Sequence, residues 1–192
     1  MKEIILIGGG GHCKSVIDVI EHDGSFKIIG IVDKSNLIGT KVLGHEIIAS
    51  DNDLSKLAKK HKYAIVSIGQ IESPKLRIQL YDTAIKAGFI LPSIISPNAY
   101  VSKYAKLGSG TIIMNHAVVN ANASIGDNCI VNTKALIEHD CSISNHCHIS
   151  TNATINGGAT IESGCFIGSN STTKELAKIT KNSFIKAGSL VV

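Results

Sequence analysis

A histidine between two carboxylates is the group in this chain best suited to catalysis. His139 lies in the run Glu138-His139-Asp140. Either carboxylate could orient the imidazole and raise its basicity, which favours a general base for proton transfer. Gly157 lies 18 residues further along the chain. If the chain coils with 18 residues per turn, this glycine lies directly above the histidine and leaves space and a backbone N–H for an electrophilic carbonyl.

Four consecutive glycines near the N-terminus indicate a second site, for a phosphate. Gly8 to Gly11 follow an apolar run and precede a helix-like segment, and N–H groups at the start of a helix bind phosphate oxygens. His12 could donate to the same phosphate. Asp33 is either an ordinary turn aspartate or the acid that meets a ribose or base. Because Cys13 replaces the third glycine of a dinucleotide fingerprint, the pattern favours a mononucleotide or nucleotide-sugar over NAD.

A strict six-residue repeat positions the histidine. Every sixth residue from Ile95 to Val191 is aliphatic, except Thr173, and a small residue follows four positions after each. A helix does not produce a period of six and a simple strand repeats at two, whereas a coil with three flat sides does. The pattern therefore predicts a parallel β-helix of roughly five coils. Four of the small residues are cysteines, which we expect to be buried, reduced thiols: Cys129, Cys141, Cys147 and Cys165.

The N-terminal third has a different pattern, in which apolar strands alternate with helices. We expect strands at residues 3–7, 26–33 and 63–69, and helices at residues 12–22, 53–60 and 73–87. This alternation predicts a small parallel α/β sheet of Rossmann type. The prolines near residues 92–97 mark the boundary, so we place a Rossmann-like domain at residues 1–91 and the β-helix domain at residues 92–192.

Composition and charge exclude two classes of partner. No run of ~20 predominantly apolar residues, the length that crosses a bilayer, occurs in the chain, and the first residues form a strand-like run rather than a signal peptide. We therefore expect a cytoplasmic protein that does not enter a membrane. The formal net charge of +4 is mild and the lysines are scattered, which suits an anionic small molecule and argues against nucleic acid.

Four stretches carry a resemblance to a known family: IILIGGGGH, IVDK, VSIGQ and, most specifically, the run from Asn132 to Gly158. They are similar to the sugar O- and N-acyltransferases of the sialic acid O-acetyltransferase type, which include nucleotide-sugar 4-amino N-acetyltransferases. The resemblance implies a Rossmann-like acceptor domain followed by a left-handed parallel β-helix. It also implies a homotrimer, with acetyl-CoA as co-substrate in the groove between subunits and no metal.

The resemblance also implies residue roles. His139 would be the base, Asp140 the acid that increases its basicity, and His148 and the backbone of Gly157 would contact acetyl-CoA. Six residues would line the acceptor pocket: Gly10, Gly11, His12, Asp33, Lys34 and Gly69. The expected reaction is acetyl transfer to the amine of a nucleotide-linked amino sugar in bacterial surface-glycan biosynthesis. The alternative is O-acetylation of a sialic- or legionaminic-type nonulosonic acid, which has no diphosphate for the glycine loop to bind.

Two other classes of function stay open. γ-Carbonic anhydrases are also left-handed β-helix trimers, and His139, His146 and His148 could bind zinc as three neutral imidazoles. The added N-terminal domain argues against that metalloenzyme. A solenoid is also stable without an active site, so a non-catalytic scaffold is the second alternative. Its support is that the sequence stops at Val192, where members of the family continue into a Gly-x-Pro-Ala-Lys-like tail that helps hold the coenzyme.

Overall fold

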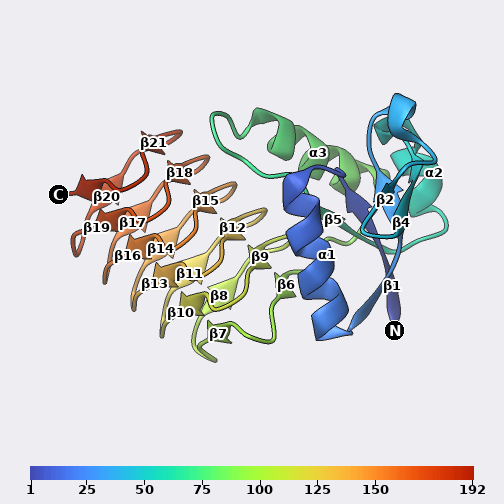
Figure 1. Cartoon of the computed structure of the whole chain (residues 1–192). Coiled ribbons are helices and arrows are strands. Elements are labelled where there is room, and N and C mark those ends of the chain that lie inside the picture. The colour runs from blue at the N-terminus through green and yellow to red at the C-terminus, as the bar shows by residue number, and fades with distance from the viewer. The chain divides into compact units, whose positions relative to one another are not determined.

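The computed structural model describes residues 1–192, and the chain divides into two compact units (Figure 1). The first unit comprises Met1–Gly69 and Lys75–Pro92, and the second comprises Gln70–Pro74 and Ser93–Val192. The short segment Gln70–Pro74, which the sequence analysis assigned to the first domain, therefore belongs with the β-helix. A long-range contact holds this segment against the β-helix: the Gln70 carbonyl accepts a hydrogen bond from Nδ1 of His148 at 2.5 Å.

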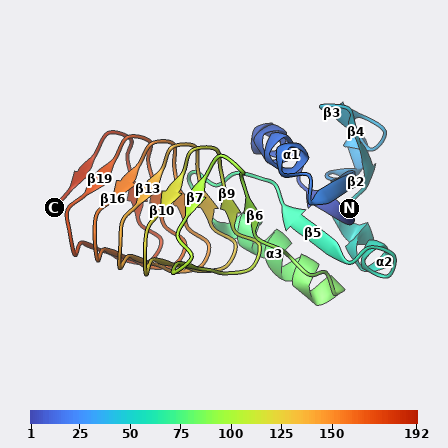
Figure 2. The same ribbon diagram turned by 90° about the horizontal axis from the view of Figure 1, so that it is seen from below.

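The first unit is a mostly parallel sheet in the order β3-β4-β2-β1-β5. Only the short β3 runs antiparallel, at the edge beside β4. Helices cover both faces, α1 on one and α2 and α3 on the other (Figure 2). The elements are β1 (Lys2–Ile7), α1 (Gly11–Asp23), β2 (Phe26–Val32), η1 (Ser35–Leu37), β3 (Lys41–Val42), β4 (His45–Ala49), η2 (Asp51–Asp53), α2 (Leu54–Ala58), β5 (Tyr63–Val66) and α3 (Lys75–Ala87).

This sheet confirms the Rossmann-like prediction, with three local differences. The β3–β4 hairpin was not predicted, because its strands are short and carry no long apolar run. The helix expected at residues 53–60 begins as the one-turn η2, where Ser50 and Asp53 form a capping box. The strand expected at residues 63–69 ends at Val66, because Ser67 turns its hydroxyl to the carbonyl of Gly8 at 2.6 Å.

The second unit is a parallel β-helix whose flat sides form three sheets of 6, 5 and 6 strands. Each strand has two residues and pairs with strands 18 residues away, as Val118 pairs with Leu136 and Tyr100. The strands are β6 (Ile94–Ile95), β7 (Tyr100–Val101), β8 (Lys106–Leu107), β9 (Ile112–Ile113), β10 (Val118–Val119), β11 (Ser124–Ile125), β12 (Ile130–Val131), β13 (Leu136–Ile137), β14 (Ser142–Ile143), β15 (His148–Ile149), β16 (Thr154–Ile155), β17 (Thr160–Ile161), β18 (Phe166–Ile167), β19 (Thr172–Thr173), β20 (Lys178–Ile179), β21 (Phe184–Ile185) and β22 (Leu190–Val191).

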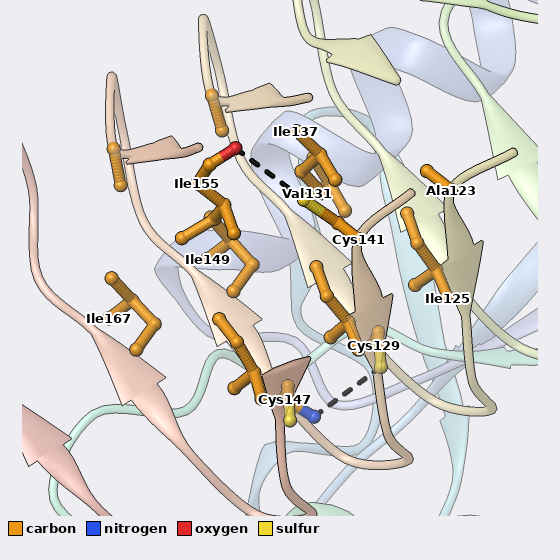
Figure 3. Packing of buried hydrophobic residues seen from close by; sticks show 14 of the residues in the cluster. Ala123, Ile125, Cys129, Val131, Ile137, Cys141, Cys147, Ile149, Ile155 and Ile167 are labelled. Carbon is orange, nitrogen blue, oxygen red and sulfur yellow. Dashed lines mark hydrogen bonds between the residues drawn. The ribbon is translucent and has the colours of Figure 1, made fainter. Parts of the chain in front are cut away.

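The core of the coil consists of the two predicted sets of side chains. In the central rungs, the second residue of each strand and the small residue that follows are both buried (Figure 3). All five cysteines are free and buried. Thr173, the exception to the aliphatic series, is also buried, and its hydroxyl accepts a hydrogen bond from the N–H of Asn156 at 3.0 Å. The core therefore tolerates a threonine because its one polar atom is satisfied.

The corners of the coil have a regular backbone conformation that the sequence analysis missed. From Gly110 onward, one residue at each corner is left-handed, with φ between 54° and 76°, and it directly precedes the small residue of the rung. Glycine, asparagine, aspartate and histidine tolerate this conformation best, and they occupy most of these positions. The corner residues are Gly110, His116, Asn122, Asn128, Lys134, Asp140, His146, Asn152, Gly158, Gly164, Asn170, Leu176, Asn182 and Gly188. None of the helices in the structure has the length and apolarity that crossing a bilayer requires.

Candidate functional site

The imidazole of His139 is held by one carboxylate in a short chain of hydrogen bonds. Its Nδ1 lies 2.7 Å from Oδ2 of Asp140, and Oδ1 of Asp140 accepts from the side-chain amide of Asn122 at 2.7 Å. Because the carboxylate can only accept, Nδ1 carries the proton and Nε2 keeps a free lone pair. The hydrogen bond to Asp140 raises the pKa of His139, and those from Asn122 and His139 lower the pKa of Asp140. The pair therefore consists of a carboxylate and an imidazole whose raised pKa makes it a stronger base.

At the corner that follows β13, Asp140 and not Glu138 is bonded to the imidazole of His139. Asp140 is the left-handed corner residue, with φ at 61°, which turns its side chain alongside the ring of His139. The carboxylate of Glu138 is used elsewhere. It accepts from the side-chain amide of Asn120 at 2.9 Å and from the backbone N–H of His139 at 3.3 Å. Either acid was a candidate from the sequence, and the structure places Asp140 on the imidazole.

Gly157 lies against the free edge of the His139 ring, as the 18-residue period predicts. A Cβ atom on Gly157 would lie 2.9 Å from Cε1 and 3.0 Å from Nε2 of His139. No side chain larger than hydrogen fits there without moving the ring. At neighbouring corners the N–H at this position bonds to a side-chain oxygen, as in Ser109 and Asp127. The N–H of Gly157 makes no hydrogen bond within the chain. A basic nitrogen thus adjoins an unused backbone donor.

His148 lies on a different side of the coil from His139, because it belongs to β15 and not to the corner after β13. Its side chain is buried, and both ring nitrogens have protein partners. Nδ1 donates to the Gln70 carbonyl at 2.5 Å, and Nε2 accepts from the amide of Asn132 at 3.2 Å. Its ring also packs edge-on against Phe166. Within one subunit, His148 therefore ties the segment Gln70–Pro74 to the coil.

The glycine loop of the first unit connects β1 to the start of α1. Gly8 has φ at 103°, and a Cβ atom there would clash with Ile68, so this position requires glycine. Gly10 is the N-cap of α1 and has no side chain to satisfy the first N–H groups of the helix. Apart from the adjacent residues and the backbone of α1 itself, no atom lies within 4 Å of the positions where Cβ atoms of Gly10 or Gly11 would lie. The side-chain space at the start of α1 is therefore open, and the start of a helix presents backbone N–H groups to anions.

The other predicted acceptor residues gather near this loop. Asp33 follows β2, and its carboxylate accepts from the N–H of Gly9 at 2.5 Å and from the N–H of Lys34 at 2.7 Å. The space above Gly69, which follows β5, is bounded by the Cβ atom of His12 at 3.6 Å. The carboxyl ends of β1, β2 and β5 thus bring the six residues into one region of the sheet edge, where ligands of such folds bind. Asp33 also orders the glycine loop, which the sequence did not reveal.

Within one subunit, the three histidines considered for zinc do not converge. No group of three or more His, Cys, Asp or Glu side chains in one subunit is close enough to hold a metal ion. Among the residues missed from the sequence, Asn122 supports the His139–Asp140 pair and Gln70 anchors the segment after β5. Asn122 could have been predicted from the sequence, because it lies 18 residues before Asp140 and the same 18-residue period predicts the position of Gly157.

Two family models match this chain, one in each part. Residues 3–84 match the PglD N-terminal domain, and residues 140–175 match the bacterial transferase hexapeptide, six repeats. A comparison with curated proteins gives no match.

Solved structures match the chain over nearly its full length. The acetyltransferase domain of PglB from Neisseria gonorrhoeae is 29% identical with a TM-score of 0.93, covering 100% of this chain and 92% of that one. The same domain in complex with acetyl coenzyme A is 29% identical with a TM-score of 0.91, covering 99% of this chain and 92% of that one. A mutant perosamine N-acetyltransferase from Caulobacter crescentus, in complex with CoA and GDP-perosamine, is 29% identical with a TM-score of 0.71, covering 99% and 93%. These matches confirm the two-part fold.

Proposed function

We propose that this chain, which belongs to the sugar acyltransferases with a PglD N-terminal domain and hexapeptide repeats, acetylates the amine of a nucleotide-linked amino sugar. Acetyl-CoA is the donor in this proposal, as the complexes of the related proteins suggest. The observation that carries the proposal is the position of His139, with Nδ1 on Asp140 and Nε2 beside Gly157. A non-catalytic scaffold has no need for this arrangement.

The proposed reaction uses the two groups at the corner in turn. The lone pair of the neutral acceptor amine attacks the thioester carbonyl carbon while Nε2 of His139 removes a proton from the nitrogen. The N–H of Gly157 donates to the oxygen that becomes negative in the tetrahedral intermediate. The carbon–sulfur bond then breaks, the amide forms, and the protonated His139 returns its proton to the leaving thiolate. Asp140 stabilises the imidazolium that exists between the two proton transfers.

The acceptor in this proposal binds through its diphosphate at the start of α1. The open N–H groups of Gly10 and Gly11 and the imidazole of His12 suit phosphate oxygens. Asp33 and Lys34, after β2, and Gly69, after β5, would border the nucleoside. A diphosphate uses these donors, whereas a free nonulosonic acid leaves them without a ligand. This contrast favours a nucleotide-linked acceptor over O-acetylation of a free acid.

We further propose that the active assembly is a homotrimer. His139 is exposed on a corner of its own subunit, with 66% of its side chain accessible, so one coil supplies only one wall for a coenzyme. A neighbouring subunit would supply the other wall. Light scattering should show a trimer, and a fully active monomer would contradict this.

The five free cysteines fit a reducing compartment, so we assign the enzyme to the cytoplasm.

The acceptor is tested by measuring coenzyme A release with UDP-, dTDP- and GDP-linked 4-amino sugars beside free sialic and legionaminic acids. We expect turnover with at least one nucleotide-linked amine. Turnover with the free acids alone would refute the nucleotide assignment and would support O-acetylation.

The base is tested by His139→Ala, which should lower kcat by roughly 10²- to 10⁴-fold, the usual share of a general base. Binding of coenzyme A should change little. His116→Ala is the matched control, because His116 is an exposed corner histidine in another column of the coil. Near-normal turnover of His139→Ala would remove His139 from the mechanism.

A further inference from the structure

One corner residue next to the proposed donor site breaks the pattern of its column. Leu176 lies two coils after Asp140 in the column that runs through Asn122, Asp140 and Gly158. It is left-handed, with φ at 57°, although leucine gains nothing from this conformation and its Cβ atom crowds the following carbonyl. Its side chain is also 74% exposed. A leucine that is both strained and exposed to solvent lowers the stability of the fold. We therefore expect a functional reason for a leucine at this corner.

The neighbours of Leu176 belong to the donor site. Its N–H donates to the carbonyl of Gly157 at 2.9 Å. Its side chain folds down over Gly158, where Cδ2 occupies space 2.6 Å from the position of a Cβ atom. The isobutyl group therefore lies over Gly158, the residue next to Gly157 and one coil beyond Asp140. An apolar surface lies directly beside the place proposed for the thioester.

The charges around this corner indicate what the surface contacts. Lys174 and Lys178 flank Leu176 on either side and are exposed. After residue 173 the chain has four lysines and a single acid, Glu175. If the thioester lies at Gly157, as proposed, these exposed lysines can pair with the phosphates of the donor. The neutral, methyl-bearing pantetheine arm between the two then passes over Leu176. We propose that Leu176 is a coenzyme-binding residue that packs against the pantetheine arm of acetyl-CoA. This inference rests on the proposed function.

Leu176→Asn and Leu176→Gly test the inference, because both residues suit a left-handed corner and neither has an apolar side chain. The dissociation constant of coenzyme A, measured by calorimetry, should rise on the order of 10-fold in both variants, as expected for losing a few buried methyl contacts. The KM for acetyl-CoA should rise with it, while kcat changes less. Relief of backbone strain should raise the melting temperature by roughly 2–4 °C. A variant that is more stable and binds worse separates binding from folding.

Three controls make the result specific to the arm. Leu176→Met keeps an apolar side chain and should retain most of the affinity. Lys134→Asn relieves the same backbone strain at a corner in another column, with φ at 60°. It should stabilise the fold without weakening the binding of coenzyme A. Adenosine 3′,5′-bisphosphate, which lacks the arm, should bind every variant as it binds the wild type. An equal loss of affinity for this nucleotide would overturn the inference.

The other outcomes are also decisive. Wild-type affinity in Leu176→Asn and Leu176→Gly would show that the arm does not contact Leu176, and the proposed function would stand. Dissociation of the assembly in both variants would identify Leu176 as a subunit contact and refute the inference. Failure of the wild type to bind coenzyme A at all would remove the proposed function, and the inference with it.

Discussion

Gly157→Ala is the most direct perturbation of the proposed site, because it adds one methyl group beside Nε2 of His139, the nitrogen proposed as the base. The new Cβ would lie 2.9 Å from Cε1 of His139, whereas ordinary contacts are 3.4–4 Å, so the ring must move by about 0.5–1 Å. The backbone itself accepts alanine, since Ala121 occupies the same position two coils earlier. A misplacement of about 1 Å costs on the order of 10²-fold in rate. We therefore expect kcat/KM to fall by about 10²-fold.

The assay compares kcat/KM, coenzyme release and thermal stability in the same preparation. The melting temperature should stay within about 2 °C of wild type, because the three atoms nearest to the new methyl group all belong to the exposed side chain of His139. In a His139→Ala background the same substitution should cost little further activity, since the group that it displaces is gone. Wild-type kcat/KM in Gly157→Ala would refute the reasoning, as would an equal loss in both backgrounds.

Two further predictions concern the carboxylates. Asp140→Asn removes the main cause of the raised pKa of His139, so the acid limb of the pH–rate profile should move to lower pH while the maximal rate falls; a profile that keeps its acid limb would exclude Asp140 as the orienting acid. Asp33→Ala leaves the N–H groups of Gly9 and Lys34 without their acceptor, so the acceptor KM should rise on the order of 10-fold with little change in the acetyl-CoA KM. Asp23→Ala, which removes an exposed contact to Ser25, is its control, and an equal effect of both changes would contradict a specific role for Asp33.

The repeat made the β-helix predictable to the residue. Because each rung pairs with rungs 18 positions away, the register alone placed Gly157 above His139 and the cysteines in the core. The alternation of strands and helices was sufficient for the Rossmann-like sheet, and the glycine run for the start of α1. The short β3–β4 hairpin lacked such a signal, because strands of 2 and 5 residues show little periodicity.

The partners of the candidate site residues depended on tertiary structure. Glu138 and Asp140 flank His139 equally in sequence, and only the left-handed turn at Asp140 decides which carboxylate reaches the ring. The place of Gln70 depends on a contact with His148, 78 residues away, which no local pattern encodes. The sequence by itself determined which residues stack, because stacking follows from a period. Only the tertiary structure decided which polar atoms form hydrogen bonds, through the turn of a single corner and through long-range packing. The reason is that a hydrogen bond depends on direction and distance within a few ångströms.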